Sequence, residues 1–328
     1  MSQFIDAERI NQASFKATSL SFSELSREDG VYRGKSRNFC LPKLRSEENL
    51  YPTIRESAIE HFSKNNIKWH QGINRKPTNH LCSSQVFCVN FLFPFANHPI
   101  LLAKFFQPIF PEINYMIPVE DGYYVTFEWI GKKNYLKEKI AKNHIRTRGA
   151  LFTSADSIFM FKSIENKRHI VLIEWKYTES YGNKSIKYSK YRTDRSEIYK
   201  HLFLSNDCPI NKDVLPSFDS LFYDPFDQLM RQQFLANEME KSHEMNADFV
   251  SVLHISPSQN IDIQKVTSPE LMNLGDTPIE VWQKLVKNKN RFKSISTEEL
   301  FTNFQRVDTP KVSLWVDYMK SRYNWITL

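Results

Sequence analysis

Residues 153–180 read TSADSIFMFKSIENKRHIVLIEWKYTES and contain two apolar runs separated by a short charged link. The runs DSIFMFKS and HIVLIEWKY are rich in β-branched and aromatic residues, and the link IENKR is polar. This pattern is typical of two β-strands joined as a hairpin. The first run begins at Asp156, and the second ends in Glu174 and Lys176. Since charged groups are expensive to bury, their place at the ends of two core strands needs a reason.

The geometry of a hairpin brings these charged residues together. Side chains alternate between the two faces of a strand, so Glu174 and Lys176 share a face while Trp175 points into the core. In a hairpin whose turn is centred near residue 166, Asp156 lies at the same end as this pair. Two carboxylates can bind Mg²⁺, and a lysine can orient or deprotonate an attacking water. The cluster therefore indicates phosphodiester hydrolysis; the alternative is an ordinary surface ion pair at a strand end.

The composition of the chain sets the broad class. Its 328 residues include 41% hydrophobic and 14% aromatic side chains, which is enough for a substantial core. The net charge of +7 fits a polyanionic partner. The four cysteines form no CxxC pair, which favours a reducing compartment. Because residues 1–12 lack an apolar signal segment and the greasy stretch 86–106 is interrupted by polar residues and prolines, we expect a cytoplasmic protein with no membrane span.

The periodicity along the rest of the chain predicts an α/β fold. Helices are expected over 51–66, from Ser83 as N-cap to about 96 with a restart after Pro99, near 196–203, over 224–242 with Asp224 as N-cap, and over 277–286, 296–304 and 314–325. Further strands are expected over 123–130 and 247–256. This order predicts an α/β/α sandwich with a central mixed sheet.

The same pass divides the chain into three parts. Residues 1–47 are polar and mixed in sign, so we expect an extended or loosely packed N-terminal arm. Residues 48–264 form the predicted core. Residues 265–328 are expected to be a C-terminal helical extension that packs on this core.

The charged residues and the strand order resemble the PD-(D/E)XK nuclease superfamily, and most closely its restriction-endonuclease-like bacterial proteins. The likeness covers about residues 50–256. It rests on SSQ…N at Ser83, Ser84, Gln85 and Asn90, on RxRG…TSAD from Arg146 to Asp156, and on IEWKYTESY from Ile173 to Tyr181. The resemblance implies a restriction-endonuclease-like fold and DNA as substrate. It also implies that Asp156 and Glu174 bind Mg²⁺ (or Mn²⁺) and that Lys176 positions the attacking water.

Two positions depart from the superfamily's pattern. Ala155 stands where a proline often precedes the aspartate, which matters little because that proline is often missing. The glutamate that the superfamily often has on its first core helix is replaced by Gln85, which we place at the catalytic site. Glu128, on the strand expected over 123–130, could fill this gap as a third acid on the metal. The alternative is that it faces solvent or pairs with a nearby lysine.

Polar and basic residues around the cluster are candidates for contacts with nucleic acid. Gln228, Arg231 and Gln232 share one face of the helix over 224–242, and related nucleases often place Gln or Arg from this helix near the metal or the phosphate. Arginines ahead of the aspartate can grip phosphate, and a lysine- and tyrosine-rich loop suits a strand with unstacked bases. The candidates are Arg146, Arg148, Ser154, Tyr181, Lys184, Lys187, Gln228 and Arg231. For the helix and the loop, the alternative is an ordinary solvated surface.

Three functions fit these patterns. The first is a metal-dependent nuclease that cuts DNA. The second is a catalytically inactive nucleic-acid-binding module with a nuclease fold, motivated by the missing glutamate. The third is a protein–protein adaptor with affinity for neither metal nor DNA. Because a double-strand cut usually needs two active sites, a homodimer is a possible assembly of the first.

Overall fold

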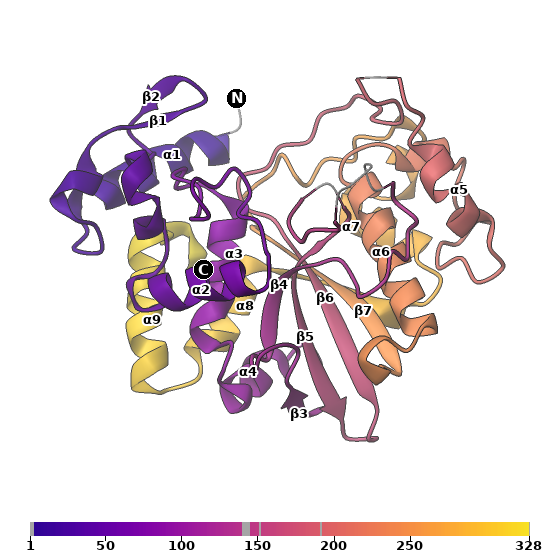
Figure 1. Cartoon of the computed structure of the whole chain (residues 1–328). Coiled ribbons are helices and arrows are strands. Elements are labelled where there is room, and N and C mark those ends of the chain that lie inside the picture. The colour runs from indigo at the N-terminus through magenta and orange to yellow at the C-terminus, as the bar shows by residue number, and fades with distance from the viewer. Residues whose placement is uncertain (1–2, 140–144, 151, 191, 328) are drawn as a thin grey trace.

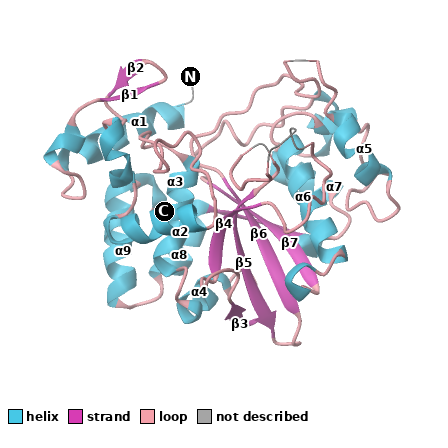
Figure 2. Cartoon of the chain, in the orientation of Figure 1, coloured by secondary structure: helices cyan, strands magenta, loops and turns pink. Residues whose placement is uncertain are grey.

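A mixed β-sheet lies at the centre of the molecule, and helices cover both of its faces (Figures 1 and 2). The computed structural model describes residues 3–139, 145–150, 152–190 and 192–327. Within these residues the sheet has six strands: β3 (Ile113–Ile117), β4 (Val125–Trp129), β5 (Ala155–Ser163), β6 (Arg168–Trp175), β7 (Phe249–Ser256) and β8 (Phe292–Ser296). Strand β5 pairs antiparallel with β3, β4 and β6, whereas β7 pairs parallel with β6 and β8. The predicted sandwich around a central mixed sheet is confirmed.

The helices form two layers, one on each side of the sheet. They are α1 (Gln3–Thr18), α2 (Arg55–Lys64), α3 (Ser84–Leu92), α4 (Pro99–Phe106), α5 (Ser196–Leu204), α6 (Phe226–Lys241), α7 (Pro278–Leu285), α8 (Thr297–Gln305) and α9 (Pro310–Arg322). In Figure 1, α2, α3, α8 and α9 lie on one side of the sheet, and α5, α6 and α7 lie on the other. Each layer buries its own hydrophobic cluster against the sheet.

Alternation along the strands explains the two clusters. Val171, Ile173 and Trp175 of β6 belong to the cluster under α3 and α9, whereas Ile170 and Leu172 belong to the cluster under α6. Because β6 is paired on both edges and covered on both faces, its middle, from Ile170 to Ile173, is a continuous apolar run. The predicted hairpin is confirmed, since β5 and β6 pair antiparallel across a short link.

The helix over residues 84–92 is mostly apolar, and all of its residues after Ser84 are buried. As predicted, Ser83 is its N-cap, and the Ser83 side chain accepts a hydrogen bond from the Val86 amide at 3.3 Å. A second helix, α4, begins at Pro99. No helix in the described part of the chain is long and apolar enough to cross a membrane.

The prediction of an extended arm over residues 1–47 is wrong. Residues 3–47 contain α1, a hairpin of β1 (Gly30–Tyr32) and β2 (Lys35–Arg37), and short 3-10 turns. Phe4 and Phe15 are buried in the main core, and the Gln12 amide donates to the carbonyl oxygen of Arg322 on α9 at 3.0 Å. The N-terminal segment therefore packs against the C-terminal helix, and the division of the chain at residues 47 and 264 stays a prediction.

Three smaller features also differ from the sequence analysis. Asp224 does not cap α6, because that helix begins at Phe226, with Pro225 in the cap position and no side-chain cap bond. Strands β3 and β8 were not predicted. Both are short, and β8 lies beside β7 only because a helix returns the chain to the sheet edge.

Candidate active site

The open end of the β5–β6 hairpin brings the predicted charged residues together. Ser157 pairs with Ile173, so the residues at positions 156 and 174 lie opposite each other one step further along. The Asp156 carboxylate accepts a hydrogen bond from the Trp175 amide at 2.6 Å. The Lys176 ammonium lies 2.6 Å from a Glu174 carboxylate oxygen, and both side chains are buried. Trp175 points into the opposite core, as predicted.

Helix α6 supplies two amides to this cluster. The Lys176 ammonium donates to the Gln228 side-chain oxygen at 2.5 Å, and the Gln232 amide donates to Glu174 at 2.9 Å. These two glutamines are four residues apart and therefore lie on one face of the helix. Arg231, from the same helix, instead pairs with Asp227 at 2.9 Å and donates to the Thr153 hydroxyl at 2.9 Å.

Glu128 approaches the cluster from an irregular point in β4. The pairing of β4 with β5 skips this residue, and its φ of 51° is in the left-handed region, which a non-glycine residue rarely adopts. The carboxylate accepts hydrogen bonds from Gln85 and from Ser154, both at 2.7 Å. Strain of this kind is concentrated at functional sites, where the surrounding structure holds it in place. Gln85 lines the same cavity and holds this glutamate from another element, and a catalytic role for it stays a prediction.

Burial and like charge shape the protonation of these groups. Burial raises the pKa of Asp156 well above its ordinary value, and the neighbouring carboxylates of Glu174 and Glu128 raise it further. Burial also raises the pKa of Glu128, against the hydrogen bonds from Ser154 and Gln85. Burial alone would lower the pKa of Lys176, but the nearby acidic groups, of which Glu174 contributes most, together hold that pKa above its ordinary value. The ammonium therefore keeps its proton at neutral pH.

The donor set suits a hard divalent cation. Two buried carboxylates, Glu128 and Glu174, and the half-buried carboxyl group of Asp156 lie close together, and a cation would offset the like charge that raises the pKa of Asp156. Mg²⁺ binds through one or two carboxylates and completes its shell with waters or phosphate oxygens. Within the described residues, no three His, Cys, Asp or Glu side chains are grouped as ligands of one ion. Since one or two carboxylates can be enough for Mg²⁺, Asp156 and Glu174 are the residues that could hold it, with Glu128 nearby.

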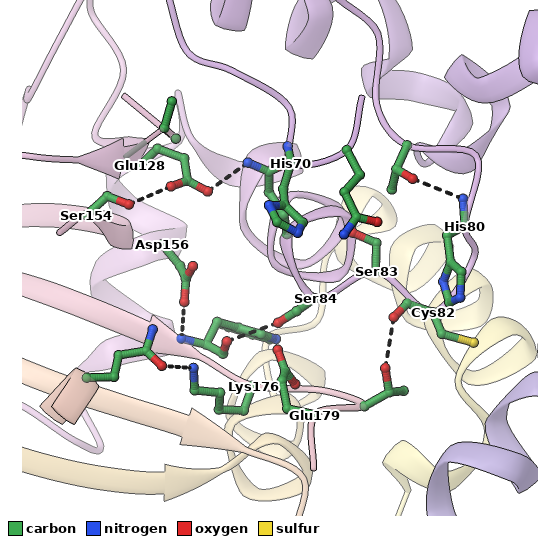
Figure 3. A pocket seen from close by; sticks show the side chains of 18 of the residues that line it. His70, His80, Cys82, Ser83, Ser84, Glu128, Ser154, Asp156, Lys176 and Glu179 are labelled. Atoms are coloured by element: carbon green, nitrogen blue, oxygen red, sulfur yellow. Dashed lines mark hydrogen bonds between the residues drawn. The ribbon is translucent and has the colours of Figure 1, made fainter. Parts of the chain in front are cut away.

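A cavity of about 550 Å³ opens over the cluster. In Figure 3, Glu128, Asp156 and Lys176 lie on one side of it, and His70 and Ser84 lie on the other. Its wall also includes the tip of the N-terminal hairpin, at Tyr32 and Arg33, and the side chain of Gln228. The site is therefore a cleft between the sheet end and the segments that precede and cap α3.

The predicted phosphate-binding arginines make contacts within the protein. Arg148 pairs with Glu120 at 2.7 Å and donates to the Phe127 carbonyl oxygen at 3.0 Å, next to the irregular residue of β4. Arg146 donates to the carbonyl oxygens of Ile130 and Gly131. Both guanidinium groups thus brace the strand that presents Glu128, and a contact with phosphate stays a prediction for them.

In the basic loop that follows the site, one lysine is paired with an acid of the protein and another is exposed to solvent. Lys187 pairs with Asp219 at 2.8 Å, whereas Lys184 is exposed. The Tyr181 hydroxyl is buried and has no hydrogen-bond partner among the described residues. Tyr191, which belongs to the same predicted pattern, lies outside the described residues.

Two residues near the cluster were missed. The Ser84 hydroxyl donates to the Trp175 carbonyl oxygen at 3.0 Å and so ties the start of α3 to the end of β6. His254 of β7 lies opposite Glu174, and burial together with Lys176 lowers its pKa to about 3. The signal for His254 was present, because it is a polar residue near the end of an apolar strand, as Glu174 is.

The fold and the site define a protein of the restriction-endonuclease-like class. A family model described as restriction endonuclease associating with ARP (REase-ARP) matches residues 9–324. The chain belongs to this family, which confirms the resemblance drawn from the sequence and extends it to α1 and α9. A comparison with curated proteins and a comparison with solved structures each gave no match.

Proposed function

We propose that the protein is a metal-dependent nuclease that hydrolyses phosphodiester bonds in DNA. The observation that carries this proposal is the convergence of Asp156, Glu174 and Lys176 at the open end of the β5–β6 hairpin, where Asp156 and Lys176 line an open cavity. Membership of a restriction endonuclease family supports the same chemistry and DNA as the substrate. In this account Asp156 and Glu174 hold Mg²⁺ or Mn²⁺. A bound ion would lower the pKa of a water molecule and offset charge on the phosphate.

Lys176 orients the attacking water and offsets charge on the phosphate. Because Glu174 holds its pKa above the ordinary value, the ammonium is a hydrogen-bond donor rather than a general base at neutral pH. Gln228 and Glu174 fix its position. Gln232 orients the other oxygen of Glu174, so α6 acts through the cluster that it packs on.

Glu128 is our candidate for a third acid, and Gln85 is the residue that positions it. Both oxygens of Glu128 accept hydrogen bonds in this structure, so binding a metal would require one of these bonds to be exchanged. The residues proposed to contact DNA remain Arg146, Arg148, Ser154, Tyr181, Lys184, Lys187, Gln228 and Arg231. We further propose a cytoplasmic protein, a homodimer for double-strand cuts, and the association with ARP that the description of the family names.

A cleavage assay tests this function. The purified chain is incubated with supercoiled plasmid and Mg²⁺, and Asp156→Ala and Lys176→Ala are compared with it. We expect cutting by the wild-type chain and its loss in both variants, with folding verified by circular dichroism. Cutting at the wild-type rate by either folded variant would contradict the assignment.

A second candidate is an inactive nucleic-acid-binding module. Two observations favour it: Gln85 occupies the helix position where related nucleases often have an acid, and no three ligand side chains are grouped on one ion within the described residues. This candidate predicts DNA binding that is independent of Mn²⁺. The two candidates differ most sharply in whether the wild-type chain binds Mn²⁺ without DNA.

A further inference from the structure

The floor of the candidate active site is acidic, whereas the substrate in the proposed function is a polyanion. Glu128 and Asp156 line the cavity, and Lys176, which also lines it, is already paired with the buried Glu174 at 2.6 Å. A phosphate backbone brought to this floor meets like charge. Positive charge on the rim is therefore needed to hold a nucleic acid in place.

Most of the cations predicted to serve this purpose are engaged with acids of the protein itself. Arg148 is paired with Glu120, and Lys187 is paired with Asp219. Arg231 is likewise paired with Asp227. Because each of these charges is offset locally, the rim must draw positive charge from elsewhere.

The N-terminal hairpin presents unpaired cations at the rim. The sequence from residue 30 to residue 46 contains five lysines and arginines and no acidic residue. The hairpin cations Arg33, Lys35 and Arg37 are exposed, and none of the three forms an ion pair with another described residue. Tyr32 and Arg33 line the same cavity as Asp156. In Figure 1 the hairpin stands at the same end of the sheet as the start of β5 and the end of β6.

The register of the hairpin places its cations on one face. Tyr32 pairs with Lys35, and Gly30 pairs with Arg37, so Lys35 and Arg37 lie on the face that carries Tyr32. The Tyr32 ring lies 4.6 Å from the His80 ring, which also lines the cavity. The face that turns toward the cavity is therefore the face that bears the positive charge.

The turn of the hairpin contains an arginine where its geometry favours other residues. Arg33 and Gly34 connect the strands with φ of 49° and 75°, as in a type I′ turn. Asn, Asp and Gly are preferred at both central positions of such a turn, because other side chains are strained at positive φ. An arginine at this position indicates that its side chain has a use outside the turn.

We propose that the β1–β2 hairpin is a phosphate-binding arm of the nuclease. Arg33, Lys35 and Arg37 contact the sugar-phosphate backbone of DNA beside the scissile bond and hold the strand over the acidic floor. This inference rests on the proposed function and adds to it an element that grips the substrate. The contacts are to phosphate, so they raise affinity without reading base sequence.

Binding of DNA as a function of salt tests this arm. The affinity for a fluorescent duplex is measured by anisotropy in EDTA, where metal-dependent cutting cannot occur, over a series of salt concentrations. The test variant is Arg33→Asn combined with Lys35→Gln and Arg37→Gln. Asparagine suits the turn better than arginine does, so the hairpin is retained. The matched control neutralises three exposed cations that do not line the cavity, in Lys287→Gln, Lys289→Gln and Arg306→Gln.

We expect the hairpin variant to bind at least about tenfold more weakly at moderate salt, and its salt slope to fall by about 2 to 3, since each lost phosphate contact removes about 0.9. The control variant keeps the wild-type slope. In cleavage with Mg²⁺, the hairpin variant raises KM and leaves kcat unchanged, because the arm does not act on the reacting phosphate.

The outcomes separate this inference from the proposed function. A wild-type chain that binds and cuts DNA, with equal affinity and slope in the hairpin variant, overturns the arm alone. An equal loss in the control variant also overturns it, because the effect is then one of net charge. A wild-type chain that does not bind DNA overturns both.

Discussion

The two ends of the β5–β6 hairpin both carry a lysine beside a carboxylate, but in opposite surroundings. At the turn, Lys167 lies 3.4 Å from Asp248, and the two side chains are 48% and 36% exposed. At the open end, Lys176 lies 2.6 Å from Glu174, and the two side chains are 7% and 1% exposed. The first pair is solvated, whereas the second is enclosed by the sheet and by α6.

The stability of the fold explains the exposed ion pair at the turn but not the buried ion pair at the open end. An exposed ion pair contributes about 0–1 kcal/mol to the free energy of unfolding, so replacing its residues costs little. Burying two charges costs several kcal/mol for each ion, which well-packed apolar residues would avoid. The middle of β6, from Ile170 to Ile173, is apolar, so folding would favour an apolar end as well. Charge at the buried end is therefore explained by chemistry at the cavity above it.

The largest expected effect is on catalysis. Glu174→Gln keeps the shape of the side chain but removes a negative charge from the buried end of the hairpin. We expect kcat for DNA cleavage with Mg²⁺ to fall by about 10³-fold, as it does when a group that stabilises the transition state is lost. Glu165→Gln, at the exposed turn, is the matched control and should cut at the wild-type rate. Equal activity of the two variants would remove the distinction between the two ends.

The next effect is on stability. Lys176→Met leaves the Glu174 carboxylate buried without its counter-charge, so we expect a loss of about 3–5 kcal/mol in the free energy of unfolding. Lys167→Met removes a surface pair and should change it by no more than about 1 kcal/mol. Urea unfolding of both variants measures the difference. Similar values for the two lysines would show that Lys176 is not an enclosed partner of Glu174.

A smaller effect is expected at Gln85, which acts through Glu128. Gln85→Leu removes the amide that donates to Glu128 at 2.7 Å, and kcat/KM should fall by about 10–100-fold. Gln107→Leu is its control, because Gln107 donates to the Ile113 carbonyl oxygen in β3. If Gln85 acts through Glu128, the affinity for metal should fall together with activity in Gln85→Leu, and neither should change in Gln107→Leu. An unchanged Mn²⁺ affinity would assign Gln85 a purely structural role.

The smallest expected effect is a gain in stability. Because burial and the nearby acids raise the pKa of Asp156, the folded protein prefers its neutral form. That preference stabilises the fold at pH below the ordinary pKa of aspartic acid, and it is lost as the pH rises through the raised pKa. Asp156→Asn escapes this loss and should be more stable by about 1 kcal/mol at neutral pH. Thermal melts should show the gain shrinking at acidic pH, and a variant destabilised at neutral pH contradicts it.

The open end of the hairpin was predictable because its determinants are local. A short link and two apolar runs fix the pairing, and pairing alone sets Asp156 opposite the end of β6. Glu128, Gln85 and Gln228 became candidates through the resemblance to the nuclease superfamily, and the structure brings all three to one cavity. The left-handed backbone conformation of Glu128 depends on how β4 pairs with β5, and no local sequence pattern predicts it.

The N-terminal segment was not predictable from periodicity. Helix α1 buries Glu8, Gln12 and Lys16, which are spaced four residues apart, together with Phe4 and Phe15, so its buried face is mixed rather than an apolar stripe. Their partners lie far along the chain: the Gln12 amide donates to the Arg322 carbonyl oxygen. Likewise, the pairing of Arg148 with Glu120 could not be read from a segment that looks free to grip phosphate. Local patterns locate charged groups, but tertiary structure decides which of them are offset.

The central claim is that the buried acids at the open end bind a divalent cation. Titration calorimetry with Mn²⁺, in the absence of DNA, tests it on the wild-type chain, on Asp156→Asn and on Glu165→Gln. The account predicts binding to the wild-type chain and to Glu165→Gln, and its loss in Asp156→Asn. A wild-type chain that binds DNA but no Mn²⁺, or an Asp156→Asn variant that binds Mn²⁺ unchanged, would contradict it.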